Sequence, residues 1–276
     1  MKNPIYKQFI QYLENKTLTK KNKVFETKRA LVLEMLYKVD RGEQLTNVDM
    51  LRLVNAVNVS ALTGKLEDFY SVSTSPDLNN VCKCRAADKS SICNKCFSKA
   101  SMHYKKELAL ALEINYIIFN CFNIPAACWA ALAIPSINGK ARIESHGDAG
   151  SIQGALNMNR VIESHSWLDF GVWTKNYYFW YRAFESEGKH KNCVFIVSSD
   201  KLNVVLDVPE YIKKYVDKVF TVYDFKTVKA NDIKINCGLN HCKQCKKCYT
   251  VDENTYYISE ILKKDNANYK KYLGIE

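Results

Sequence analysis

The sequence predicts an α/β protein, a partial (βα) barrel or an open parallel sheet, with an N-terminal helical region and cysteine-rich metal-binding loops. Roughly the first 60 residues place apolar side chains at helical spacing. After them, short β-prone runs alternate with helical runs, a pattern typical of parallel strands joined by crossover helices. Eight of the 11 cysteines fall into two tight groups, which indicates metal ligation.

The N-terminal region, residues 1–64, is expected to form three helices, over 3–16, 27–39 and 46–57. The third begins with Thr46-Asn47-Val48-Asp49, a capping box with Asp in place of Glu. The boundary with the next region is expected at Gly64–Lys65, where the helical pattern gives way to strands.

Residues 65–236 are expected to form the α/β partial-barrel domain, and residues 237–276 a cysteine-rich metal-binding segment with a C-terminal helix. This length is short for a barrel of eight units. The expected strands are 69–74, 141–145, 169–174, 193–198 and 218–222. The expected helices are 97–119, 152–164, 176–187, 209–216 and 256–271.

The two cysteine groups are the main functional signal. The first lies in a loop over 82–96 that follows the first strand, and the second opens the C-terminal segment. The candidate ligands are Cys82, Cys84, Cys93 and Cys96, then Cys237, Cys242, Cys245 and Cys248. A two-residue spacing lets neighbouring thiolates converge on one metal centre. The N-terminus lacks the apolar run of a secretory signal, so we expect a cytoplasmic location, where thiols stay reduced and disulfides are rare.

Two kinds of metal fit these spacings. Cys242-x2-Cys245-x2-Cys248 matches the first three ligands of a bacterial ferredoxin, with Cys237 as a fourth from upstream. The two pairs of the first group also suit zinc. An iron–sulfur cluster, 4Fe–4S, is favoured and zinc is the alternative. His241 is either another ligand or an exposed loop residue. The isolated Cys121, Cys128 and Cys193 are expected in the core.

Polar residues follow the predicted strands at the edge where ligands gather in parallel α/β folds. Asp148 and His146 could bind a hydroxyl, an amine or a proton in transit, and Lys175 an anionic group. These three are the candidate catalytic residues. The candidate cofactor-binding residues are Gly147, Ser145, Thr174 and Ser198. The alternative is structural, with Asp148 capping the next helix and Thr174 ending a strand.

The composition bears on partners. A formal charge of +11 and a pI near 9.0 favour contact with polyanions such as nucleic acid. The longest stretch of low charge, residues 121–137, is too short to span a bilayer and is expected in the core, so no membrane is expected. A small-molecule or macromolecular substrate is left open.

Four segments in order resemble the phage gene product eighty-eight-like domain family. The resemblance covers residues 69–249. Its markers are Cys93-Asn94-Lys95-Cys96-Phe97-Ser98-Lys99-Ala100, Arg142-Ile143-Glu144-Ser145-His146-Gly147-Asp148, Phe170-Gly171-Val172-Trp173-Thr174-Lys175 and Cys242-Lys243-Gln244-Cys245-Lys246-Lys247-Cys248-Tyr249. The sequence departs from the family pattern at His146, where Ser is usual, and at Phe97, where Tyr is usual.

That family is in turn similar to radical S-adenosylmethionine enzymes. The resemblance implies a 4Fe–4S cluster held by Cys93, Cys96 and one of Cys82 or Cys84. It also implies a Gly147 strand end that grips the methionine moiety of S-adenosylmethionine, auxiliary clusters in the cysteine-rich tail, and a host cytoplasmic location. The usual Cys-x3-Cys-x2-Cys spacing is absent. The alternative is a non-catalytic phage protein, stapled by zinc or clusters, that binds nucleic acid or protein.

Overall fold

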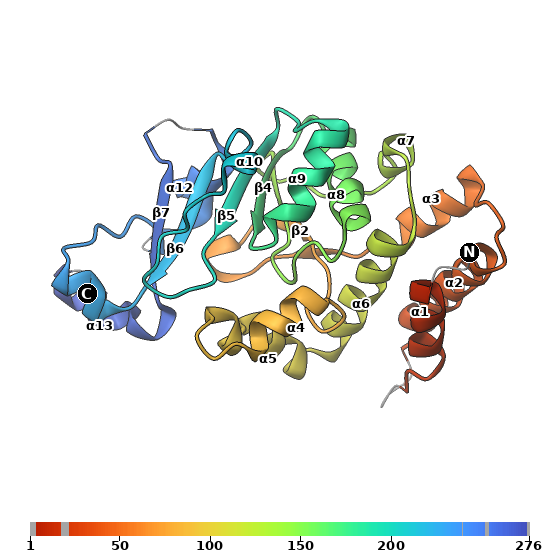
Figure 1. Cartoon of the computed structure of the whole chain (residues 1–276), viewed down its shortest axis with the longest axis horizontal. Helices are drawn as coiled ribbons and strands as arrows, with labels where there is room; N and C mark the ends of the chain where they lie inside the picture. The colour runs from red at the N-terminus through yellow and green to blue at the C-terminus, as the bar shows by residue number, and fades with distance from the viewer. Residues whose placement is uncertain (1–3, 18–21, 239, 252–253, 275–276) are drawn as a thin grey trace.

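The sheet of the computed structural model has seven strands in the order of the chain (Figure 1). The structure describes residues 4–17, 22–238, 240–251 and 254–274. β1 pairs with β2 in antiparallel fashion, and every later neighbouring pair is parallel. The strands are β1 (Val59–Ala61), β2 (Tyr70–Val72), β3 (Lys140–Ile143), β4 (Asp169–Thr174), β5 (Cys193–Ser198), β6 (Lys218–Tyr223) and β7 (Tyr257–Ile261). The α/β class and an open, mostly parallel sheet are therefore confirmed.

Helices join the parallel strands. They are α6 (Lys106–Cys121), α8 (Ile152–Ser164), α9 (Tyr177–Glu187), α10 (Glu210–Lys213) and α11 (Phe225–Ala230). Because consecutive parallel strands are neighbours, right-handed crossovers bring these helices to the same face of the sheet. α8 packs between α6 and α9 on that face (Figure 1).

The two faces of the sheet have different coverings. Along β5, Phe195 and Val197 point into the main core, which the helices complete. Val194 and Ile196 point the other way, into a smaller cluster that includes Cys248 from the C-terminal segment. The face opposite the crossover helices is thus covered by the second cysteine group.

The N-terminal helices lie at one end of the molecule (Figure 1) and share the main core with the sheet. They are α1 (Pro4–Glu14), α2 (Lys23–Asp40) and α3 (Asn47–Ala56), and α7 (Ala126–Trp129) packs nearby. The predicted capping box is confirmed. The Thr46 hydroxyl accepts from the Asp49 amide at 3.1 Å, and the Asp49 carboxylate accepts from the Thr46 amide at 3.0 Å.

Three predicted elements differ from the structure. The helix expected over 256–271 is wrong in its first half, where β7 forms, and only α13 (Asn266–Tyr272) is helical. Tyr257 to Ile261 contain aromatic and β-branched residues that pair in register with Val219 to Tyr223. The helix expected over 97–119 is broken at Lys105 into α5 (Phe97–Tyr104) and α6. The cysteine loop contains a helix of its own, α4 (Asn80–Ala87).

The core contains the three isolated cysteines. Cys121, Cys128 and Cys193 are buried, as predicted. The stretch 121–137 also contributes Phe122, Ile124 and Trp129 to the core. In the described part of the chain, no helix has both the length and the apolar character needed to cross a membrane.

Candidate metal centres and strand-end site

The first cysteine segment is fixed to the loop that follows β3. Cys82 and Cys84 lie on α4, Cys93 lies in the short helix η2 (Ile92–Lys95), and Cys96 precedes α5. Asn79 caps α4, because its side-chain oxygen accepts from the Cys82 amide at 3.3 Å. Its side-chain nitrogen donates to the Asp148 carbonyl at 2.8 Å. One buried amide therefore connects the helix that carries Cys82 to the end of β3.

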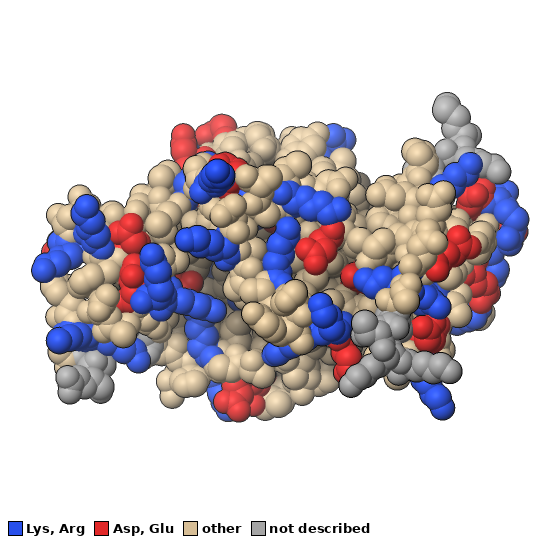
Figure 2. All heavy atoms as spheres, turned by 90° about the horizontal axis from the view of Figure 1, so that it is seen from below, with Lys and Arg blue, Asp and Glu red and all other residues tan. Residues whose placement is uncertain are grey.

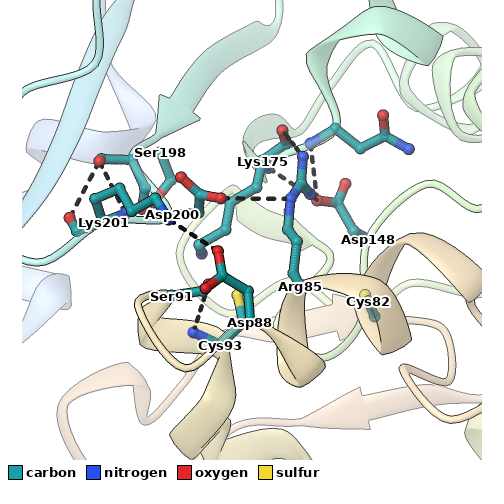
Figure 3. A network of polar contacts seen from close by, with 12 residues as sticks. Cys82, Arg85, Asp88, Ser91, Cys93, Asp148, Lys175, Ser198, Asp200 and Lys201 are labelled. Carbon is teal, nitrogen blue, oxygen red and sulfur yellow. Dashed lines mark hydrogen bonds and ion pairs between the residues drawn. The ribbon is translucent and has the colours of Figure 1, made fainter.

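Arg85 extends this attachment to two further strands (Figure 3). Its guanidinium donates to the Lys175 carbonyl at 2.6 Å, just beyond β4. It also lies 3.8 Å from the Asp148 carboxylate and 3.9 Å from that of Asp200, beyond β5. The Ile92 amide donates to the Asp200 carbonyl at 2.8 Å. The cysteine segment is thus docked on the carboxyl ends of β3, β4 and β5.

Asp148 is an anchor between strand ends. One carboxylate oxygen accepts from the Thr174 hydroxyl at 2.6 Å and from the Ala149 amide at 2.8 Å. The other accepts from the Lys175 and Asn176 amides at 2.8 and 3.0 Å. Both oxygens are committed to these contacts. The geometry gives Asp148 a structural role, but not the expected one of capping the next helix, because Ser151 is the N-cap of α8. Thr174 is the last residue of β4, as the structural alternative expected.

Glu144 and Thr74 belong to the site although sequence reasoning did not select them. Glu144 is buried and accepts from the Thr74 amide at 2.9 Å, and its other oxygen lies 2.6 Å from the Thr74 hydroxyl. Burial raises the pKa of Glu144 well above its ordinary value, so the neutral acid is favoured. The Thr74 hydroxyl can then donate to the Asp148 carbonyl, 3.3 Å away. The sequence feature that could have pointed to Glu144 is its position as an acidic residue at the end of β3, within the segment 142–148.

Gly147 is required by its surroundings. Its φ is +78°, and an added Cβ would lie 2.4 Å from the Thr74 carbonyl oxygen. No larger residue fits this turn without moving the backbone. The glycine therefore lets the loops after β2 and β3 approach each other closely.

Two neighbouring polar atoms, Ser145 Oγ and His146 Nδ1, are buried and have no hydrogen-bond partner among the residues that the structure describes. The His146 ring lies 5.7 Å from the ring of Phe97, which directly follows Cys96. Burial lowers the pKa of His146 to about 4, so the ring is neutral at pH 7. Ser198, at the end of β5, is buried, and Lys175 is half-buried. The cysteine segment therefore lies against the strand-end loops that carry these candidates, and two of the candidates have polar atoms without a partner among the described residues.

The first group of thiols is divided by exposure. Burial raises the pKa of Cys82, and the nearby acidic groups Asp148, Glu144, Cys93 and Cys96 raise it further. Cys82, Cys93 and Cys96 thus share one neighbourhood. Cys84 is exposed to solvent.

The second group lies on the face of the sheet opposite the crossover helices. Cys237 is beside Glu260 of β7, and the turn α12 (Cys242–Cys245) carries two more thiols. Lys246, with φ +55°, reverses the chain into η3 (Lys247–Tyr249), which carries Cys248. Burial raises the pKa of Cys248, and the charges of the other three thiols add to that rise. His241 is exposed.

The thiols are neighbours, but their present positions do not form a site for a single ion. All 11 cysteines are free thiols. Among the residues that the structure describes, no three His, Cys, Asp or Glu side chains are grouped closely enough to hold one metal ion. The fold therefore collects the predicted ligands into two regions, and metal binding stays a prediction.

The fold and the strand-end site define an α/β protein with an open parallel sheet and a cysteine segment docked at its carboxyl edge. Comparison with protein-family models, curated proteins and solved structures finds no match for this chain.

Proposed function

We propose that this chain is a phage-type iron–sulfur protein on a partial (βα) barrel, with the chemistry of a radical S-adenosylmethionine enzyme. The observation that carries the proposal is the docking of three grouped thiols on the strand ends. Cys82, Cys93 and Cys96 follow the first parallel strand and lie against the loops after β3, β4 and β5. Cys84 is exposed to solvent and is not one of these three proposed ligands.

Three thiolates suit a 4Fe–4S cluster with one iron free of protein ligands. Such a cluster, when bound, supplies an electron to an S-adenosylmethionine molecule held at that iron. The donor set is compatible with it, because a cluster of four irons is larger than one ion and takes thiolates that stand further apart.

The chain's own residues would bind and orient the ligands. The turn at Gly147 brings backbone close to the cysteine segment. His146, neutral and with Nδ1 unpaired, would accept a hydrogen bond from an amine or hydroxyl. Lys175 would attract an anionic group. Asp148 would act indirectly, by holding the strand ends in place.

The shape of the sheet supports a partial barrel. Its strands follow one another in chain order, and an ion pair joins Lys65, in the loop between β1 and β2, to Glu260 of β7. That loop therefore reaches the strand at the other end of the open sheet. We expect the protein to work in the cytoplasm, which for a phage protein is that of the host. Metal ligation needs reduced thiols, and the cytoplasm keeps thiols reduced.

A second candidate is a non-catalytic protein with metal staples that binds nucleic acid. Figure 2 shows basic side chains spread over the face below α4 and α5. Five exposed lysines come from this segment and its continuation into α6: Lys83, Lys89, Lys95, Lys105 and Lys106. Such a face favours a polyanion.

Anaerobic purification of the full chain separates the two candidates. The proposal expects iron and sulfide, a broad visible absorbance, and an electron paramagnetic signal that changes when S-adenosylmethionine is added. Cys93→Ala should abolish that change, and Cys84→Ser should leave it intact. A colourless protein with stoichiometric zinc that binds nucleic acid would favour the second candidate.

A further inference from the structure

Arg142 occupies an unusual position for a charged residue. It lies in the middle of β3, with Gly171 of β4 as its neighbour in register. Its guanidinium stacks over the Trp173 ring, 3.8 Å from the ring centroid. The arginine is therefore fixed by a cation–π contact against the face of the sheet opposite the crossover helices.

The second cysteine segment lies on the same patch. A Cβ added to Gly171 would lie 2.8 Å from the Cys248 carbonyl oxygen and 2.9 Å from the Tyr249 ring. The Tyr249 ring meets the Trp173 ring edge-on at 5.8 Å. The absence of a side chain at Gly171 lets Cys248 and Arg142 share one region of the sheet.

Arg142 has a donor without an acceptor. Among the described residues its buried Nε has no hydrogen-bond acceptor, although the side chain as a whole is only half-buried. Its charge acts on the Glu144 carboxyl and on the Tyr249 hydroxyl, and opposes the rise that burial causes in the pKa of each. Lys65, another cation near the thiols, is paired with Glu260. A buried N–H donor without an acceptor is unfavourable, so an acceptor held beside it would stabilise it.

The thiols of the second segment lie close to this charge. Cys237 and Cys248 pack in the same small cluster as Trp173, the ring on which Arg142 stacks. Four thiolates around a zinc ion, or around a 4Fe–4S core in its 2+ state, leave about two net negative charges. The centre would be anionic with either metal.

We propose that Arg142 is the counterion of the second metal centre, supplying positive charge and its free N–H to the group held by Cys237, Cys242, Cys245 and Cys248. This inference rests on the proposed metal binding. Arg142 is then a positioning residue. Its positive charge offsets the negative charge of four thiolates that are held together on an apolar face of the sheet. The same charge would make a cluster there easier to reduce.

The test uses the full chain with Cys93→Ser and Cys96→Ser, so that only the second centre is counted. Arg142→Met, Arg142→Lys and Tyr249→Phe are introduced into this background, with exposed Arg182→Met as the matched arginine control. Iron, sulfide and zinc per chain are measured after anaerobic purification, followed by metal release to a competing chelator. Where the centre is iron–sulfur, its midpoint potential is also measured. Circular dichroism reports on folding.

Arg142→Met should weaken metal retention about 10- to 100-fold and move a cluster's potential to more negative values. Arg142→Lys should recover most of the loss, and Tyr249→Phe and Arg182→Met should behave like the parent. Equal retention and potential in Arg142→Met and the parent would overturn the counterion role alone. An equal loss in Tyr249→Phe would assign the effect to packing and overturn it too. A parent without metal would overturn the proposed metal binding, and this inference with it.

Discussion

The side-chain amide of Asn79 joins two parts of the site, donating to the Asp148 carbonyl at 2.8 Å while its oxygen caps the helix that carries Cys82. Asn79 is fully buried, so neither contact competes with water. The position of the first thiol is therefore coupled to the position of the β3 strand end.

Cys82 and Cys84 form a matched pair two residues apart on one helix. We expect Cys82→Ser to remove metal from the first centre, because its thiol shares surroundings with Cys93 and Cys96. Cys84→Ser should retain that metal, because its side chain faces solvent. Metal per chain after anaerobic purification, in a chain with Cys242→Ser and Cys245→Ser, measures both. Loss in Cys84→Ser with retention in Cys82→Ser would reverse the assignment.

Gly147→Ala should destabilise the fold strongly. The new methyl group would lie 2.4 Å from the Thr74 carbonyl oxygen, and φ is positive. We expect the free energy of unfolding to fall by more than about 2 kcal/mol. Gly42→Ala is the control, with φ +85° and nothing within 4 Å, and should lose only about 1 kcal/mol. Denaturant unfolding compares the two, and equal losses would argue against tight packing at Gly147.

Asp148→Asn should lower the free energy of unfolding by about 2 to 3 kcal/mol. The amide nitrogen of Asn would face N–H or O–H groups, from which the carboxylate oxygens now accept hydrogen bonds. Asp77→Asn is the control. Its carboxylate is half-exposed and 3.9 Å from Lys99, so the change should stay below about 1 kcal/mol. Thermal or denaturant unfolding at pH 7 gives both values. A small effect at Asp148 would contradict its anchoring role.

Glu144 should make stability depend on pH. Its pKa is raised on folding, so the folded chain holds the proton more tightly than the unfolded chain. That stabilisation is complete below about pH 4, the range of an unfolded glutamate, and is lost as pH rises toward the raised pKa. Glu144→Gln mimics the neutral acid and removes this dependence. It should therefore be at least as stable as the parent at about pH 7.

Denaturant unfolding at about pH 5 and about pH 8 measures this difference, with exposed Glu107→Gln as the control. The free energy of unfolding of the parent, minus that of Glu144→Gln, should decrease with rising pH. A difference that is constant between the two pH values would show that Glu144 has the same affinity for a proton in both states.

Regular elements were predictable where one local pattern dominates. The strands at 169–174 and 193–198 and the helix at 152–164 have the bounds expected. The segment 257–261 was not predictable as a strand, because its assignment depends on pairing with β6, far away in sequence. The open parallel sheet followed from the alternation of elements, but the choice of residues facing each side depended on register.

The sequence predicted which region of the fold forms the site, but not the role of each residue in it. Cysteine spacing and strand-end polarity selected Cys82, His146 and Asp148, which the structure brings near one another. Spacing could not separate Cys82 from Cys84, because exposure is decided by how α4 docks. Nor could it reveal Thr74 as the partner of Glu144, since 70 residues separate them.

Iron and sulfide per chain in anaerobically purified protein carrying Cys242→Ser and Cys245→Ser most directly test the central claim, that thiols docked on the strand ends hold a cluster. With the second centre disabled, we predict about four irons and about four sulfides per chain at full loading. These should be lost when Cys93→Ser is added. Stoichiometric zinc, or iron that survives the loss of Cys93, would contradict the account.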